Sequence, residues 1–322
     1  MKRILSVMLA ALLAAAVFTG CGTSSAPPKN DGGGKVSVVA TIFPPYDFTR
    51  QIAGDRVDVT MLLPPASESH SFEPTPQDII KIQNCDVFIY VGGESDEWVN
   101  SVLSGMDTSH MKIVTLMDCV EVVEEEIVEG MEGEAEEEPA PGEAEDPEYD
   151  EHVWTSPRNA KLIVQKISDT LCEADAPGAD AYKANTAAYL AQLDQLDAEF
   201  KAVVDGAARR TMVFGDRFPF RYLADAYGLD YFAAFPGCST ETEASAATVK
   251  FLIDKVSAEH IPVVFHIELS NEKMADTISE ATGAKVLLLH ACHNISRDDF
   301  LAGKGYLDLM TDNVEALREA LN

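Results

Sequence analysis

Short runs of apolar and β-branched residues recur along the chain and predict eight β-strands. The strands are expected at 36–41, 57–63, 86–91, 112–116, 211–215, 230–235, 261–267 and 285–290. Helical patterns lie between them, at 47–54, 76–83, 97–104, 157–174, 217–228, 244–259, 270–282 and 308–321. Several strands are apolar nearly throughout, which is typical of parallel strands covered on both faces. The alternation of strands and helices in both halves predicts an α/β protein with doubly wound lobes.

One segment between the two halves has a different pattern, with a single apolar stripe that repeats every three or four residues. The stripe consists of Tyr182, Thr186, Tyr189, Leu193, Leu196, Phe200 and Val203. This spacing predicts one continuous helix with a buried face. Its length of roughly 40 Å fits a rigid strut, assigned to residues 176–206, that joins the halves. A coiled-coil dimer is the alternative explanation of the same stripe.

The beginning of the chain predicts a secretory signal at 1–20. Two basic residues precede an uncharged apolar run at 4–18, which is shorter than the roughly twenty residues that span a membrane. The Thr-Gly-Cys sequence after this run resembles a bacterial lipobox in which Cys21 is lipidated, and an ordinary cleaved signal is the alternative. Residues 21–35 are expected to form a flexible tether. The mature protein is therefore expected outside the cytoplasm, lipid-anchored to the bacterial cell membrane.

The chain is strongly acidic, with 54 Asp and Glu against 24 Lys and Arg and a formal net charge of -30. Such a charge repels nucleic-acid phosphates and anionic bilayers, and it leaves cations as attractive partners. Sixteen of the acidic residues lie in 121–151, which contains no Lys or Arg. This composition predicts a solvated, mobile loop that does not pack as a core.

Histidine and aspartate residues stand close to the ends of predicted strands. His70 lies in a proline-rich loop after the second strand, and His152 follows the acidic loop. His290 and His293 lie at the end of the last strand, and Asp216 directly follows the fifth. Open parallel sheets bind ligands beyond the carboxyl ends of their strands. Three imidazoles with one carboxylate form a tetrahedral set suited to zinc, whereas two of each would favour manganese.

Four features of the sequence together resemble the zinc/manganese substrate-binding lipoproteins of bacterial ABC transporters. They are "SHSFEPTPQD", "EHVWTSP", the long central helix and "FPGCSTETEAS". The resemblance covers nearly the whole mature chain. It implies two Rossmann-like lobes with parallel sheets, joined by one rigid helix, with a metal in the interlobe cleft. The lobes would be residues 36–175, including the acidic loop, and residues 207–322.

The same resemblance implies which residues hold the metal. His70 matches the family's first histidine ligand, and His152 matches its second. The family's fourth ligand, usually an aspartate, falls on His290 here. His293 is an alternative at that place, and both histidines could face the cleft.

The third ligand departs from the family pattern. The family has His or Glu at a place that falls on Arg217 in this sequence, and a guanidinium cannot bind a metal. Asp216 is the substitute expected to bind, although it could instead pair with Arg217 or Arg221. Cys238 and Cys292 are further candidates outside the family pattern.

These observations predict a protein that captures a divalent transition metal, with zinc first and manganese as the alternative, and delivers it to an ABC permease. Its affinity should fall as acid protonates the histidines. The acidic loop is either a metal-collecting antenna or a solubilising insertion. We expect a monomer that is not an enzyme. A surface adhesin and a zinc hydrolase are the competing hypotheses, but the hydrolase motif HExxH is absent and only Glu73 or Glu268 could serve as its base.

Five cysteines remain after Cys21 is set aside, so at least one thiol is unpaired within a monomer. A disulfide between Cys238 and Cys292 is possible outside the cell. Cys85 and Cys172 are at least as well explained as small buried apolar residues.

Overall fold

The computed structural model describes residues 34–68, 72–133, 148–239 and 243–322. The chain divides into two compact units, residues 1–35 and 36–322, and all elements named below belong to the second. Across the described ranges, no helix has both the length and the apolar character needed to cross a membrane. The signal peptide, the lipidation site Cys21 and most of the tether lie outside the described residues.

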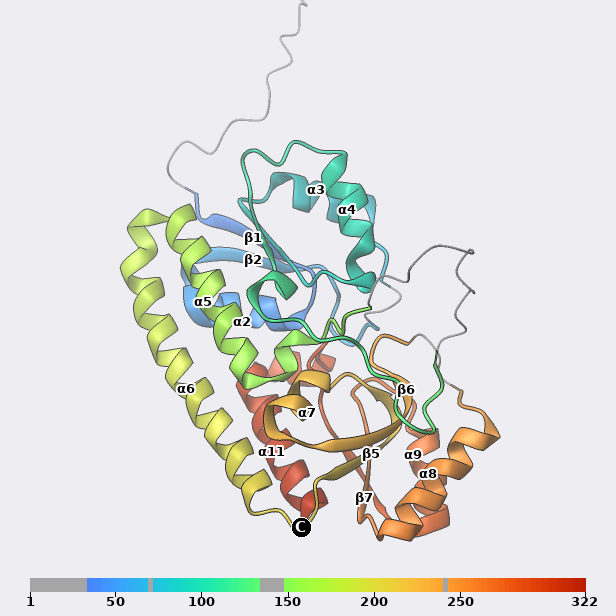
Figure 1. Ribbon diagram of the computed structural model, residues 1–322. Coiled ribbons are helices and arrows are strands. Elements are labelled where there is room, and N and C mark those ends of the chain that lie inside the picture. The colour runs from blue at the N-terminus through green and yellow to red at the C-terminus, as the bar shows by residue number, and fades with distance from the viewer. Residues whose placement is uncertain (1–33, 69–71, 134–147, 240–242) are drawn as a thin grey trace, which may run out of the picture. The chain divides into compact units, whose positions relative to one another are not determined.

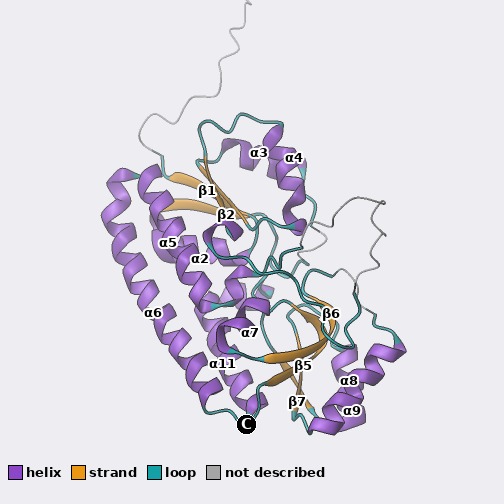
Figure 2. Ribbon diagram, in the orientation of Figure 1, coloured by secondary structure: helices purple, strands orange, loops and turns teal. Residues whose placement is uncertain are grey.

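Two four-stranded parallel sheets confirm the predicted α/β class (Figure 2). The first has the order β2-β1-β3-β4, built from β1 (Val36–Ala40), β2 (Val57–Met61), β3 (Val87–Tyr90) and β4 (Lys112–Thr115). The second has the order β6-β5-β7-β8, built from β5 (Thr211–Phe218), β6 (Asp230–Pro236), β7 (Val263–His266) and β8 (Lys285–Leu288). All strand pairs within both sheets are parallel. Each of the eight predicted strands is present.

Helices pack on both sheets, and their positions follow the predicted pattern with a few differences. The first lobe contains α2 (Phe43–Ala53), α3 (Pro76–Asn84), α4 (Glu97–Ser104) and α5 (Pro157–Ala174). The second contains α7 (Arg221–Tyr227), α8 (Ala246–Glu259), α9 (Lys273–Thr282), α10 (Arg297–Ala302) and α11 (Tyr306–Leu321). Short 3-10 helices in the described ranges are η1 (Gly54–Arg56), η2 (Glu94–Asp96), η3 (Met117–Cys119), η4 (Val153–Thr155) and η5 (Ala176–Gly178). Helix α10 was not predicted; it begins where the Ser296 hydroxyl accepts the Asp299 backbone N–H at 3.0 Å.

Two boundaries differ from the prediction for local reasons. Helix α2 begins at Phe43, earlier than expected, because proline fits the first turn of a helix. Helix α7 begins at Arg221, later than expected, because β5 continues to Phe218 after a register shift between Phe214 and Arg217. Asp216 therefore lies within a strand and does not follow one.

The long helix α6 (Ala179–Asp205) contains 27 residues and runs past elements of both lobes (Figure 1). All seven residues of the predicted stripe are buried. They pack against α5, α2 and α11 of the same chain. Because the stripe is covered within the chain, the coiled-coil alternative loses its support.

The acidic segment is only partly described, and its described parts contradict the expectation that it does not pack. Glu124 and Tyr149 form an antiparallel bridge. The Glu132 backbone N–H donates to the Ala234 carbonyl in β6 at 2.9 Å, so the segment packs on the second lobe. Met131 is buried within the main hydrophobic core. Residues 134–147, which carry the middle of the predicted loop, lie outside the described residues.

Candidate metal-binding site

His152 is fully buried where the acidic segment re-enters the first lobe. The Asp150 Oδ1 atom accepts hydrogen bonds from the His152 backbone N–H at 2.8 Å and from the ring Nδ1 at 3.0 Å. A carboxylate only accepts, so Nδ1 carries a proton, and in the neutral ring the lone pair is on Nε2. A carboxylate that orients an imidazole in this way is the usual support of a metal-binding histidine.

The electrostatic environment of His152 favours positive charge. Burial by itself disfavours the imidazolium, but the nearby carboxylates of Asp150, Glu151 and Glu125 outweigh it and raise the pKa of His152. The same carboxylates are themselves costly to bury, and burial raises the pKa of Glu125 to about 7. A site that stabilises a cationic ring also attracts a divalent cation.

His293, from the second lobe, lies directly against His152. The two ring centroids are 4.4 Å apart and the ring planes meet at 81°. Trp154 packs on both rings, and its Nε1–H donates to the Ala291 carbonyl at 2.7 Å. The structure thus brings together a histidine from each lobe at the point where the lobes meet.

The turn that carries His293 is held by a buried carboxylate. Glu268, just after β7, accepts the backbone N–H of Ala291 at 2.6 Å and of His293 at 3.0 Å. His290 belongs to the same turn, and its Nδ1 accepts the Cys292 backbone N–H at 3.0 Å. Cys292 has a φ of 63°, the left-handed region, where a non-glycine residue needs such support. Glu268 thereby has a positioning task, which weakens its candidacy as a hydrolytic base.

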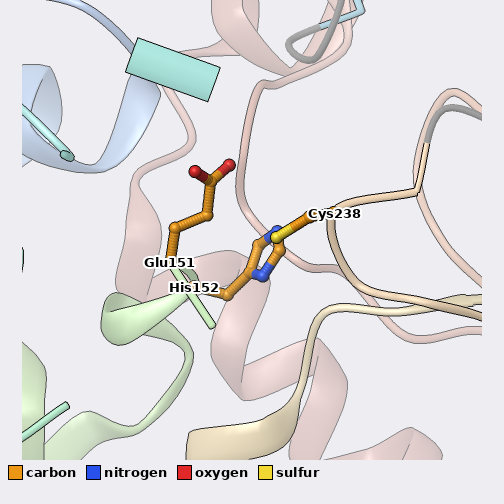
Figure 3. Close-up of side chains that lie close together, drawn as sticks. All are labelled: Glu151, His152 and Cys238. Atoms are coloured by element: carbon orange, nitrogen blue, oxygen red, sulfur yellow. The ribbon is translucent and has the colours of Figure 1, made fainter. Parts of the chain in front are cut away.

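A third group of ligand-type side chains involves His152 again. One ligand atom each of Glu151, His152 and Cys238 lie within 4.8 Å of one another. Figure 3 shows the Cys238 sulfur beside the imidazole and the Glu151 carboxylate above both in this view. Ser95 holds the Glu151 carboxylate through its hydroxyl and through its backbone N–H, the latter at 3.2 Å.

The sequence also predicted His70 and Asp216 as ligands. His70 lies outside the described residues, but its described neighbours Glu68 and Phe72 each line a cavity that also has His293 on its wall. Asp216 uses both carboxylate oxygens on backbone groups: Oδ1 accepts the N–H of Arg217 at 2.8 Å and Oδ2 that of Ile267 at 3.0 Å. The assignments of His70, His152, Asp216 and His290 as ligands therefore stay predictions.

The guanidinium groups of the two arginines near Asp216 in sequence bind elsewhere. The Arg217 guanidinium pairs with Glu68 at 3.3 Å. That of Arg221 pairs with Asp225 and, at 3.5 Å, with Glu126 of the acidic segment. The carboxylate of Asp216 therefore accepts backbone hydrogen bonds and forms no ion pair with either guanidinium.

Several residues of the site were not singled out from the sequence. Asp150 and Glu151 precede His152 in the motif. An acidic residue two positions before a histidine indicates the hydrogen bond that Asp150 accepts from the His152 ring. The sequence indicates Glu268 only as a possible base. Glu268 stands just after the end of a buried strand. This position indicates a residue of the site, because parallel sheets bind ligands beyond the carboxyl ends of their strands.

The five cysteines of the described chain are all free. Cys238 and Cys292 therefore do not form a disulfide with each other. Cys85 and Cys292 are buried, whereas Cys172 is only partly so. The small-apolar explanation holds for Cys85, whose thiol has its pKa raised by burial to about 12.

The family model described as ZnuA, zinc-uptake complex component A periplasmic, matches residues 38–320. The chain belongs to this family. A relative in Bacillus subtilis (strain 168), the high-affinity zinc uptake system protein ZnuA, is 32% identical over 302 residues, which are 94% of this chain and 92% of the relative. The zinc-binding lipoprotein AdcA of Streptococcus pneumoniae (strain ATCC BAA-255 / R6) is 31% identical over 99% of this chain, which spans 61% of AdcA.

A solved structure from this family has the same fold. The crystal structure of the Zn(II)-bound ZnuA-like domain of Streptococcus pneumoniae AdcA superposes with a TM-score of 0.74 and 29% sequence identity. The superposition covers 89% of this chain and 99% of that domain. The zinc-uptake family is a family of transporter components, and the chain shares its two parallel-sheet lobes and its long helix.

Proposed function

We propose that this protein captures a zinc ion outside the cytoplasm and delivers it to an ABC permease for uptake. The observation that carries the proposal is the contact of His152 with His293, because it joins one imidazole from each lobe in a carboxylate-rich, buried place. Membership of the zinc-uptake family supports the choice of zinc over manganese.

The proposed ion is held between the lobes, with His152 and a histidine of the 290–293 turn as ligands. Of the two histidines of this turn, the contact with His152 favours His293, since the His290 Nδ1 already accepts a backbone N–H. His70 is proposed as a third imidazole, on the strength of its sequence motif and of its described neighbours. Asp216 is the weaker carboxylate candidate, because its oxygens accept backbone hydrogen bonds.

Zinc analysis of purified variants tests this ligand set. We expect wild type to hold one zinc ion, His293→Ala to lose it, and His290→Ala to retain it with reduced affinity through a loosened turn. His110→Ala, which changes an exposed histidine, is the matched control and should retain the ion. A His293→Ala protein that keeps zinc with unchanged affinity contradicts the ligand assignment. Metal-free wild type after exposure to stoichiometric zinc contradicts the function itself.

The membrane anchor is a separate part of the proposal. The Thr-Gly-Cys sequence supports lipidation at Cys21, which would hold a monomer at the outer face of the cell membrane. Fractionation of cells that express wild type or Cys21→Ser tests this point. We expect wild type in the membrane fraction and the variant released; equal membrane association would contradict the anchor.

A further inference from the structure

Resting on the proposed zinc capture, we propose that the thiol of Cys238 is a metal ligand beside His152. Cys238 would give the site a sulfur donor and a preference for softer divalent cations, and Glu151 would supply an oxygen. Soft thiolate ligands favour zinc and softer ions, whereas carboxylate and carbonyl oxygens favour manganese. This residue would therefore determine specificity within the zinc site.

The geometry of three side chains from both lobes carries the inference. Ligand atoms of Glu151, His152 and Cys238 all lie within 4.8 Å of one another (Figure 3). Ligands that share one zinc ion at its usual bond lengths are roughly 3.5 Å apart. The three donors therefore need to approach one another by at most about 1.3 Å to share one ion. Glu151 and His152 are buried, and Cys238 is partly exposed.

Gly237 allows this close approach. A β-carbon at position 237 would lie 2.9 Å from Cε1 and 3.0 Å from Nδ1 of His152, closer than nearly all real contacts of a β-carbon. The loop after β6 can therefore reach the imidazole only because position 237 has no side chain. Glu125, from the acidic segment, fixes the same loop by accepting the Cys238 backbone N–H at 3.3 Å. The sulfur is thus held at the carboxyl end of β6, where open parallel sheets bind ligands.

The chemistry of binding is a simple exchange of a proton for a metal. The S–H bond breaks, the sulfur lone pair bonds to the cation, and the proton leaves to solvent. No oxidant or reductant takes part. A bound cation drives this exchange, because a coordinating thiol is deprotonated outright.

Cobalt(II) is the probe that detects the sulfur ligand directly. Co²⁺ occupies sites of this kind and shows a near-ultraviolet sulfur-to-cobalt charge-transfer band only when a thiolate is bound. We expect this band at one equivalent of Co²⁺ in wild type and in Cys172→Ala, the matched control for a partly buried cysteine. We expect Cys238→Ala to lose the band and to bind Cd²⁺ about a hundredfold more weakly, since even outer-shell substitutions cost roughly 10–100-fold.

Three outcomes overturn the inference, and they are distinguishable from failure of the proposed function. Stoichiometric Co²⁺ binding without the band removes Cys238 from the site while zinc capture stands. A band that persists in Cys238→Ala likewise shows that Cys238 is not a ligand, while zinc capture stands. Absence of any Co²⁺ or Zn²⁺ binding in wild type overturns both the inference and the proposed function.

A measurement on unmodified protein guards against a variant that fails to fold. Zinc X-ray absorption of the loaded wild type should show one sulfur neighbour at about 2.3 Å, and a first shell of nitrogen and oxygen alone contradicts the inference. Gly237→Ala should weaken the cobalt band by pushing the loop away from His152. Gly105→Ala, where an added β-carbon has only ordinary contacts, is its control and should leave the band unchanged.

Discussion

The two lobes share one sheet topology but differ in the segments that come after their last strands. Both place the first strand in chain order between the second and third, giving β2-β1-β3-β4 and β6-β5-β7-β8. After β4 the chain crosses to the other lobe and returns over more than thirty residues before it reaches His152. After β8 it reaches His293 within a few residues. The same scaffold thus presents one histidine from a long crossing segment and one from a tight turn.

This difference shows that each histidine is positioned with help from the opposite lobe. The Tyr222 hydroxyl, in α7 of the second lobe, donates to the Asp150 carbonyl at 2.7 Å and accepts the Val123 N–H at 3.3 Å. It thereby fixes both ends of the crossing segment. In return, Trp154 of the first lobe donates to Ala291 in the turn of the second. The site is therefore a property of the pair of lobes.

Trp154→Ala should have the largest effect, because it removes the residue that touches both histidines. Trp154 is 1% exposed, and deleting a buried aromatic side chain costs about 3–5 kcal/mol of unfolding free energy. Chemical denaturation of metal-free protein measures this loss. Trp98→Ala, at a partly buried tryptophan that packs on Phe72, is the control, and zinc should rescue it more fully than it rescues Trp154→Ala. Equal rescue by zinc would show that Trp154 only fills the core.

Asp96→Asn should reveal a pH dependence that belongs to the first lobe. Burial raises the pKa of Asp96 to about 7 from its ordinary value of 3.8. Between these values the folded protein holds a proton that the unfolded chain has lost, so stability falls as pH rises through this window and is then constant. Asparagine removes the cost of burying an ionised carboxylate, and its side-chain oxygen can accept the same Val91 N–H.

The expected gain from Asp96→Asn is near zero at pH 4 and grows to at most about 4 kcal/mol at pH 8. Denaturant unfolding of variant and wild type across this range measures it. The exposed Asp55→Asn serves as control and should show no such growth. A difference that does not change with pH would contradict the account of Asp96.

Glu268→Gln should loosen the second-lobe turn without removing any proposed ligand. A carboxylate accepts both the Ala291 and the His293 N–H, whereas an amide has one accepting oxygen and presents N–H to the other donor. We expect zinc affinity to fall roughly 10–100-fold, measured by competition with a chelator. Glu272→Gln, at an exposed glutamate nearby, is the control. Unchanged affinity would show that the turn needs no support from Glu268.

Replacement of residues 134–147 by a Gly-Ser segment of equal length should have the smallest effect. The replaced stretch contains seven acidic residues, but Glu125 and Glu132 make their contacts from outside it. We expect equilibrium zinc affinity within about threefold of wild type, and a slower association at low salt because acidic charge steers cations. An association rate unchanged at every ionic strength would favour the solubilising insertion over the antenna.

The sheets could be predicted from sequence because their signal is local. The run Val-Phe-Ile-Tyr of β3, for instance, is apolar throughout because strands buried on both faces need it to be. The apolar stripe on α6 could also be predicted, because its repeat is local in the sequence. The packing of the acidic segment was not predictable, because its partners lie far along the chain; Val123 and Tyr222 are 99 positions apart.

The site was predictable in its residue types more than in its geometry. His152 was found from its motif, and its burial and its carboxylate support agree with a ligand. The proximity of His293 and Cys238 to it depends on how two lobes meet, which no local pattern encodes. The extension of β5 through Asp216 is a tertiary effect of the same kind, since Oδ2 of this residue accepts an N–H after β7.

The most direct test is a double-mutant cycle on zinc binding with His152→Ala, His293→Ala and their combination. If one histidine from each lobe holds the same ion, wild type binds one tight zinc ion, each single variant loses it, and the double variant is no worse than either single. Additive losses, or one tight ion retained in either single variant, would contradict a site shared by the two lobes.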